Sequence, residues 1–314
     1  MDRINKGLLV IAAVLVAFSA FRLMQGGRQP VQLLDVPALV AADVVSLRFE
    51  GPDGVLGATR SAESWILTEP EAVRADSRKI EALLSDWAGG FGADLRVNEN
   101  PDEEAEQLYG LDPEHRTSLR ISGADSPLVD LHLGKSIAGG SHYLRAAGAK
   151  TVYRGRVPGS SRLKPALNLW EDRRLLPELS PDAVRIEVRG SHGPIVFHRS
   201  AENDDWQFDG EGEFTVANSK INALARSLGN FNARSILRGG NAEKERAGAA
   251  LDSPRLTISV VDGSGRSSTI ELGADHKDRG FLYASLLGDP RLFVLPQSIL
   301  KNFDKDAAGL GGGV

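Results

Sequence analysis

The sequence predicts an α+β protein in which two tandem copies of a mixed, largely antiparallel sheet-plus-helix domain follow an N-terminal transmembrane helix. Three observations lead to this fold class. The chain begins with an apolar run. A segment that predicts a tryptophan-containing strand and an amphipathic helix occurs twice. Segments of alternating apolar and polar residues follow each predicted helix. Strands, helices and further strands joined by short connections imply a largely antiparallel α+β domain.

Residues 1–29 are predicted to form a membrane anchor and linker. An apolar or small run covers residues 7–21 and follows two basic residues. A helix needs about 20 residues to span a bilayer, and Arg22 can lengthen the usable span by reaching the interface. An uncleaved anchor is the favoured interpretation. A cleaved signal peptide is the alternative, because small residues within 17–20 offer a cleavage site.

The orientation of the chain is inferred from the position of this anchor. A hydrophobic signal so close to the N-terminus normally exports the remainder of the chain, and long domains translocate largely regardless of their charge. Residues 30–314 are therefore expected outside the cytoplasmic membrane. The predicted location is the bacterial inner membrane, with a single pass, a cytoplasmic N-terminus and the bulk of the chain in the periplasm. Membrane lipid would be contacted through the anchor.

The two copies are identified by collinear matches along the chain. Trp65 matches Trp206 at an offset of 206 − 65 = 141, and this offset drifts to 139 or 140 further on. Isolated matches would be noise, but ordered matches over about 110 residues indicate duplication of a whole domain. The predicted domains are 43–180 and 183–308, followed by a flexible tail at 309–314.

Each copy shows the same order of elements. Segments 44–50 and 184–190 alternate apolar and polar residues, as half-buried strands do, and a second short strand and the tryptophan strand come after each. In the next segment the apolar residues have helical i, i+3, i+4, i+7 spacing, so one helical face is expected to be buried. These helix positions are Ile80, Leu83, Leu84 and Trp87.

The helix starts are predicted from capping residues. Asp76 or Ser77 is expected to cap the first long helix, and Asn218 or Ser219 its counterpart. A shorter helix is expected after Asn100 as N-cap, and its counterpart opens at Asn241. Each copy then continues with three or four strands. They are expected at 117–122, 128–134, 142–147 and 151–155, and at 255–261, 268–273, 281–286 and 291–295.

Composition and motifs argue against several kinds of activity. Of 314 residues, 41% are apolar and 25% charged, as in folded globular proteins. The net charge of -5 argues against a nucleic-acid partner, and the lack of cysteine excludes disulfides and thiolate chemistry. Gly134-Lys135-Ser136 lacks the earlier glycine of a phosphate loop, because Val129 stands there, and is predicted to be part of a hairpin. No catalytic, cofactor-binding or metal-binding residues are predicted.

Two features allow both a structural and a functional interpretation. Trp65 and Trp206 are expected to anchor the two cores, with a ligand platform of the kind found in sugar-binding proteins as the alternative. Trp170, Arg173 and Arg174 lie in the charged junction between the copies. That junction is expected to be a solvated, salt-bridged linker, or alternatively a segment that fixes the angle between the domains or binds a partner.

A set of short motifs in fixed order resembles the DUF4340 family over about residues 40–300. In the second copy the motifs are weaker, with Ala249-Ala250 in place of the Tyr-Gly pair and Ser285 in place of the arginine. The matching motifs are an N-terminal anchor, Trp65 with Pro70, Ala75-Asp76, Tyr109 to Asp112, Leu133-Gly134, Tyr143 to Arg145, Val152-Tyr153 and the Trp170 to Leu176 junction.

The resemblance implies a bacterial membrane-anchored protein of undefined activity, often associated with ABC-type export systems and similar to the extracytoplasmic part of gliding-motility auxiliary proteins. It carries no catalytic residues and no cofactor. The leading hypothesis is a non-enzymatic periplasmic binding or scaffolding module with a membrane-protein partner such as ABC transporter components. An envelope carbohydrate binder or hydrolase using an interdomain cleft is the alternative. The candidate binding or interdomain residues are Trp65, Trp206, Tyr109, Tyr143, Arg145, Trp170, Arg173 and Arg174.

Overall fold

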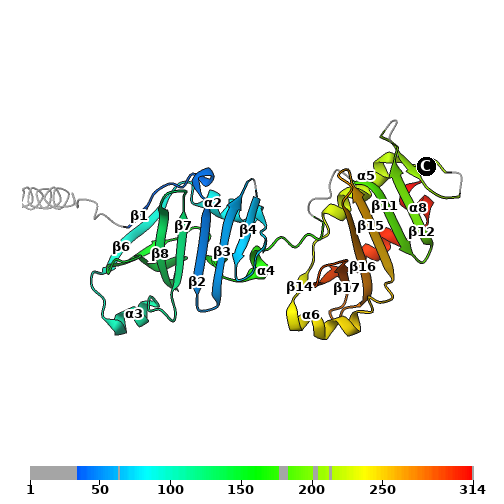
Figure 1. Cartoon of the computed structure of the whole chain (residues 1–314). Helices are drawn as coiled ribbons and strands as arrows, with labels where there is room; N and C mark the ends of the chain where they lie inside the picture. The colour runs from blue at the N-terminus through cyan, green and yellow to red at the C-terminus, as the bar shows by residue number, and fades with distance from the viewer. Residues whose placement is uncertain (1–33, 63, 177–182, 201–203, 212–213, 313–314) are drawn as a thin grey trace, which may run out of the picture. The chain divides into compact units, whose positions relative to one another are not determined.

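The chain folds into two compact units, divided after Trp170 (Figure 1). The sequence predicts a boundary between residues 180 and 183. In the structure the second unit begins at Glu171, so the charged junction after Trp170 belongs to the second unit. The predicted anchor at 1–29 lies outside the described residues. Within the described part of the chain, no helix is long and apolar enough to cross a membrane. The computed structural model describes residues 34–62, 64–176, 183–200, 204–211 and 214–312.

The first unit is built on a ten-stranded sheet in which each neighbouring pair is antiparallel. The order is β1-β6-β10-β9-β8-β7-β2-β3-β4-β5. The strands are β1 (Asp35–Val36), β2 (Ser46–Gly51), β3 (Gly54–Ser61), β4 (Ser64–Glu69), β5 (Val73–Arg74), β6 (Phe91–Asn98), β7 (Thr117–Ser122), β8 (Pro127–Ile137), β9 (Ser141–Ala146) and β10 (Val152–Arg156). The helices are η1 (Ala41–Asp43), α2 (Ser77–Asp86), α3 (Glu103–Tyr109), η2 (Ser160–Arg162) and α4 (Leu167–Trp170).

The second unit has an eight-stranded sheet, again with antiparallel neighbours throughout. The order is β13-β12-β11-β15-β16-β17-β18-β14. The strands are β11 (Ala183–Gly190), β12 (Gly193–Arg199), β13 (Trp206–Phe208), β14 (Ser235–Leu237), β15 (Leu256–Asp262), β16 (Ser267–Asp275), β17 (Phe281–Leu286) and β18 (Leu292–Pro296). The helices are α5 (Asn218–Gly229), α6 (Gly239–Arg246), η3 (Ala247–Ala249), α7 (Ser298–Phe303) and α8 (Ala307–Gly311).

The two sheets share one topology. Read from β6 to β4, the first sheet runs β6-β10-β9-β8-β7-β2-β3-β4, and the second, read in the same direction, runs β14-β18-β17-β16-β15-β11-β12-β13. These strands match one for one in the order expected from the repeated sequence. The predicted α+β class with two sheet-rich domains is therefore confirmed, and the sheets are antiparallel at every pair of neighbouring strands described.

One face of each sheet is buried under a helix. In α2, Ile80, Leu83 and Leu84 have no exposed surface, as the helical spacing predicts, and they pack against apolar residues from alternate positions of the strands. In α5, Ile221 and Leu228 do the same. Burying one such side chain contributes roughly 1.5 to 3 kcal/mol, so each helix is held by its apolar face rather than by its intrinsic helix propensity.

The hairpin between β8 and β9 forms as predicted. Gly139 and Gly140 lie in its turn with φ of 81° and 73°, a region that favours glycine. The cap of α3 differs from prediction: Asp102, not Asn100, caps this helix by accepting from Ala105 N at 2.9 Å. The reason is spacing, because only Asp102 lies directly before the first helical residue. Asp76 is the N-cap residue of α2, as predicted, although its side chain makes no capping hydrogen bond, whereas α5 has Ala217 at this position instead of Asn218 or Ser219.

The end of each unit closes onto the start of its long helix. The backbone N of Asp76 donates to Trp170 O at 2.7 Å, and that of Ala217 donates to Gly311 O at 2.7 Å. A matched lysine reinforces each contact: Lys79 Nζ donates to Leu169 O at 2.7 Å and Lys220 Nζ to Gly312 O at 2.5 Å. The two lysines matched in the sequence thus serve one structural role.

This closure changes the interpretation of the C-terminus. The segment predicted as a flexible tail from 309 is folded up to Gly312, and Leu310 is 5% exposed. A large and a small side chain change places between the two units. The first unit has the small Ala58 on β3 and the large Trp170 as the residue that accepts from the start of the long helix. The second unit has the large Phe197 on β12 and Gly311 as the accepting residue. A Cβ on Gly311 would lie 2.6 Å from the Phe197 ring.

Candidate functional site

Trp65 is fully buried and holds α2 on the sheet. Its indole Nε1 donates to Glu81 Oε1 at 2.7 Å, and its backbone N donates to Ser77 Oγ at 3.0 Å. The guanidinium of Arg60 lies over the ring, 4.7 Å from its centroid, and also contacts Glu81 at 2.9 Å. One glutamate of the helix therefore joins the tryptophan and the arginine of the sheet.

Trp206 repeats this arrangement in the second unit. Its Nε1 donates to Asn222 Oδ1 at 2.9 Å and its backbone N to Asn218 Oδ1 at 2.6 Å. Arg199 lies 5.1 Å from the ring centroid and donates to the same Asn222 oxygen at 3.1 Å. The residues matched in sequence, Glu81 and Asn222, thus play equivalent parts. Both indole rings lie in the cores and offer no exposed platform for a ligand.

The junction residues have two different structural roles: Trp170 packs in the core of the first unit, whereas Arg173 and Arg174 pair with a segment of the second unit. Trp170 is 2% exposed, packs against Phe49 with ring centroids 5.4 Å apart, and donates from Nε1 to Lys164 O at 3.0 Å. Arg173 O accepts from Ala233 N at 2.8 Å, and Arg174 forms an antiparallel bridge with Asn232.

The same pairing occurs at the start of the first unit. There β1 pairs with β6, and Ala93 N donates to Leu34 O at 2.9 Å. The segment around Arg173 and Arg174 is therefore the opening edge segment of the second unit rather than a solvated linker. One salt bridge within the junction forms as predicted: the guanidinium of Arg174 pairs with the Asp172 carboxylate at 2.7 Å.

Tyr109, Tyr143 and Arg145 are brought together where the end of α3 packs on β9. The two tyrosine rings lie with centroids 4.7 Å apart. Arg145 is 7% exposed and donates to the carboxylate of Glu106 on α3 and, at 3.4 Å, to Leu111 O. Two sequence motifs that lie far apart in the chain therefore form one contact between helix and sheet.

A glycine on β8 makes this contact possible. A Cβ on Gly134 would overlap Tyr109 O, and a Cβ on its counterpart Gly273 would overlap Ala249 O. The Leu-Gly motif of each copy is thus explained by the close passage of the helix end over the strand. In the second unit Glu245 of α6 accepts from the Tyr283 hydroxyl and contacts Lys277 at 3.1 Å.

Two titratable groups, His132 in the first unit and Tyr283 in the second, have pKa values far from neutral pH. Burial, together with the hydrogen bond to Glu245, raises the pKa of Tyr283 to about 12. Burial lowers the pKa of His132 to about 4, with help from the charges of Arg116 and Arg145. A general acid or base works best with a pKa near the working pH, so neither side chain is tuned for proton transfer at pH 7.

The two histidines on the adjacent strands β8 and β9 do not meet. The register of these strands places His132 opposite Arg145, and His142 opposite Ser136. His132 Nδ1 lies 3.0 Å from Ser118 Oγ, whereas His142 Nε2 lies 3.0 Å from Ser160 Oγ. The two imidazoles therefore do not form a pair of metal ligands.

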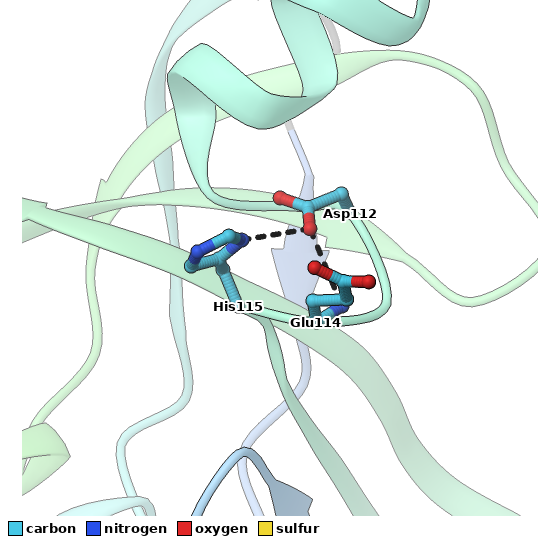
Figure 2. A group of neighbouring side chains, drawn as sticks. All are labelled: Asp112, Glu114 and His115. Carbon is cyan, nitrogen blue, oxygen red and sulfur yellow. Dashed lines mark hydrogen bonds and ion pairs between the residues drawn. The ribbon is translucent and has the colours of Figure 1, made fainter.

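A cluster that sequence reasoning missed lies in the turn after α3: Asp112, Glu114 and His115 (Figure 2). Asp112 Oδ2 lies 2.8 Å from His115 Nδ1 and accepts from Glu114 N at 3.3 Å. The hydrogen bond from His115 lowers the pKa of the Asp112 carboxyl. One ligand atom from each residue lies within 4.8 Å of the others. Carboxylate and imidazole donors at this spacing can hold a divalent cation.

The signal for this cluster was present in the sequence. Three residues of ligand type stand within the four-residue stretch from Asp112 to His115, directly after the Tyr-Gly-Leu motif. Such a stretch also reads as an ordinary polar turn, because Asp followed by Pro commonly starts a helical turn. Only the folded geometry shows that the carboxylates and the imidazole face one another.

Comparison with known proteins gives one family. The family model described as a domain of unknown function, DUF4340, matches residues 65–249 and, in a second match, residues 206–310. No curated protein matches the chain. The two matches begin at Trp65 and Trp206, the residues that hold the long helix on the sheet in each unit.

Proposed function

This chain belongs to the DUF4340 family, and we propose that it is a membrane-anchored, non-enzymatic binding or scaffolding module that works in the periplasm. The proposed partner is a membrane protein, such as a component of an ABC-type transport system. Residues 1–29 would hold the module at the inner membrane through contact with lipid. The apolar run at 7–21 and the associations that the family resemblance implies support this part of the proposal.

The observation that carries the proposal is how the motif side chains are used. Trp65 and Trp206 hold helix to sheet through paired hydrogen bonds and a stacked arginine. Glu106 and Arg145 hold α3 to β9. These motif side chains, which the sequence offers as candidate binding residues, are engaged in contacts within each unit. This use of the motifs supports a rigid module that offers surface rather than chemistry.

The surface of the first unit fits a binding role in aqueous surroundings. The sheet face opposite α2 carries charged side chains at alternate positions, with Arg120 and Asp130 paired at 2.6 Å and Arg48 and Glu50 at 2.5 Å. Arg120 is 62% exposed. The second unit exposes the Glu187 and Arg189 pair on the corresponding strand. Exposed pairs of this kind contribute little to stability, at most about 1 kcal/mol each.

The burial of the two tryptophans weighs against the carbohydrate alternative. That alternative relies on aromatic platforms at Trp65 and Trp206, and both rings are buried in the cores. A sugar stacks on an exposed aromatic face, so these two residues do not supply the contact that the alternative needs.

The test is capture of the partner from native membranes. Full-length tagged chain is crosslinked in intact cells, solubilised in detergent and purified, and the adducts are identified by mass spectrometry. The proposal expects a membrane transport component among the crosslinked species and accessibility of the folded units to protease only from the periplasmic side. Recovery of the chain alone, or cytoplasmic accessibility of the folded units, would contradict it.

A further inference from the structure

The turn after α3 holds a group of donor atoms that the fold of the domain does not require. Asp112 is anchored in the turn, since its backbone O accepts from His115 N at 3.2 Å and from Arg116 N at 3.1 Å. The carboxylate faces the His115 imidazole and the Glu114 side chain (Figure 2). The side chains of Glu114 and His115 are exposed, so both have room to change rotamer. One fixed ligand thus stands beside two adaptable ones.

We propose that Asp112, Glu114 and His115 form a binding site for a divalent transition-metal cation, with Zn²⁺ as the reference ion. Zinc binds imidazole nitrogen and carboxylate oxygen at about 2.0 to 2.2 Å, so ligand atoms around one tetrahedral ion lie about 3.3 Å apart. The three donor atoms already lie within 4.8 Å of one another. Rotation of the two exposed side chains is enough to close the remaining difference.

An unsatisfied buried oxygen supports the site independently of this spacing. Asp112 is 8% exposed, and its Oδ1 has no hydrogen-bond partner among the described residues. A buried carboxylate oxygen without a donor costs free energy, about 1 to 3 kcal/mol for a typical polar group. A cation held by this carboxylate would remove that cost.

The second copy shows that the ligands are not needed for folding. There the matching turn is Leu251-Asp252-Ser253-Pro254, which keeps the aspartate and lacks both Glu114 and His115. The helix end still passes over the strand glycine, as in the first unit. The glutamate and histidine of the first copy are therefore additional to the shared architecture, and the second unit is an internal control.

The donor set defines the class of ion. One nitrogen and two carboxylate oxygens suit Zn²⁺, Ni²⁺ or Co²⁺, whereas Ca²⁺ takes six to eight oxygen ligands. Three ligands from one exposed turn leave coordination positions open for water or for a side chain of a bound partner. The site goes beyond the proposed scaffolding role and does not depend on it.

The test is a titration of the full-length chain, purified without a polyhistidine tag, with ZnCl₂ in a calorimeter after treatment with EDTA. The wild-type chain should bind one Zn²⁺ with measurable heat. His115→Ala should weaken binding about tenfold or more, and Glu114→Gln by less, because the amide keeps an oxygen donor. The matched control is His192→Ala, which removes an exposed histidine from a turn of the second unit and should leave the affinity unchanged.

Two further readouts separate metal binding from a structural role. In EDTA the melting temperatures of wild type and His115→Ala should agree within about a degree, and Zn²⁺ should raise only that of the wild type. Co²⁺ bound to the wild type should give visible absorption that His115→Ala loses. Equal Zn²⁺ affinity in wild type and His115→Ala, or no binding at millimolar Zn²⁺, would overturn the proposal.

Discussion

The guanidinium of Arg60 lies over the indole ring of Trp65, 4.7 Å from its centroid, and both side chains bond to the same carboxylate oxygen of α2. The second unit repeats the relationship with Arg199 and Trp206 at 5.1 Å. Two copies with different helix residues reach one arrangement. This recurrence indicates that the tryptophan motif serves the attachment of helix to sheet in both units of this chain.

Replacing the tryptophan should unfold one unit selectively. Trp65→Ala leaves a large cavity in the first core and is expected to cost about 3 to 5 kcal/mol of unfolding free energy. Trp206→Ala should do the same to the second unit. Urea unfolding followed by circular dichroism measures both. Leu108→Ala, at a position 65% exposed, is the control and should change stability by less than about 0.5 kcal/mol.

The strand glycine under the helix end should resist enlargement. Gly134→Ala would push a Cβ into Tyr109 O and is expected to destabilise the first unit by about 1 to 3 kcal/mol, as overpacking does. Gly89→Ala is the matched control, because a Cβ there meets nothing within 4 Å. Thermal unfolding of the two variants measures the difference, and Gly134→Ala should have the lower melting temperature. Equal melting temperatures would show that the helix end can move away from the strand.

His132 should make the first unit sensitive to mild acid. Its pKa in the folded state is about 4, below the usual 6.5, so the unfolded chain takes up the proton first as pH falls. The stabilising effect of the neutral imidazole is fully present above about pH 6.5 and is lost as pH falls towards 4. His132→Gln should make the unfolding free energy of the first unit less dependent on pH between 6.5 and 4. Urea midpoints at pH 7.5, 5.5 and 4.5 measure the difference, and parallel profiles would contradict the prediction.

Asp262 should stabilise the second unit at neutral pH. Its carboxylate accepts from Ser264 Oγ at 2.6 Å, from Arg266 Nε at 2.8 Å and from backbone N–H groups in the β15–β16 turn. The hydroxyl of Ser264 is the main cause that lowers its pKa to about 2. The contribution is present above about pH 4 and is lost as pH falls to about 2.

The test of this turn is Asp262→Asn. The variant should have a lower unfolding free energy than the wild type at pH 7, and this difference should shrink as the pH is lowered from 4 to 2. Urea unfolding at several pH values measures the difference. A difference that stays constant with pH would mean that the charge of Asp262 contributes nothing to stability.

Much of the architecture was readable in the sequence because it depends on apolar periodicity. The spacing of Ile80, Leu83 and Leu84 predicts the buried face of α2, and collinear matches predict two related domains. The hairpin glycines Gly139 and Gly140 are explained by local backbone sterics. Each of these features is encoded within a few neighbouring residues or within one repeated pattern.

The features that the sequence did not predict depend on contacts between distant segments. The junction at Arg173 and Arg174 reads as a polar linker because its pairing with residues near Asn232 runs through backbone groups, which carry no side-chain signature. The sequence of the glycine-rich C-terminal end is typical of a flexible tail, yet Leu310 is buried in the core of the second unit. The orientation of Asp112 towards His115 is likewise a product of the folded turn.

The central claim is that the recurring motifs tie helix to sheet, and one pair of variants tests it most directly. Glu81→Gln keeps an oxygen acceptor for Trp65 and Arg60, as the neutral Asn222 does in the second unit, whereas Glu81→Ala removes it. We predict an unfolding free energy of the first unit within about 1 kcal/mol of wild type for Glu81→Gln, and a loss of about 1 to 3 kcal/mol for Glu81→Ala. Wild-type stability in Glu81→Ala would contradict the claim.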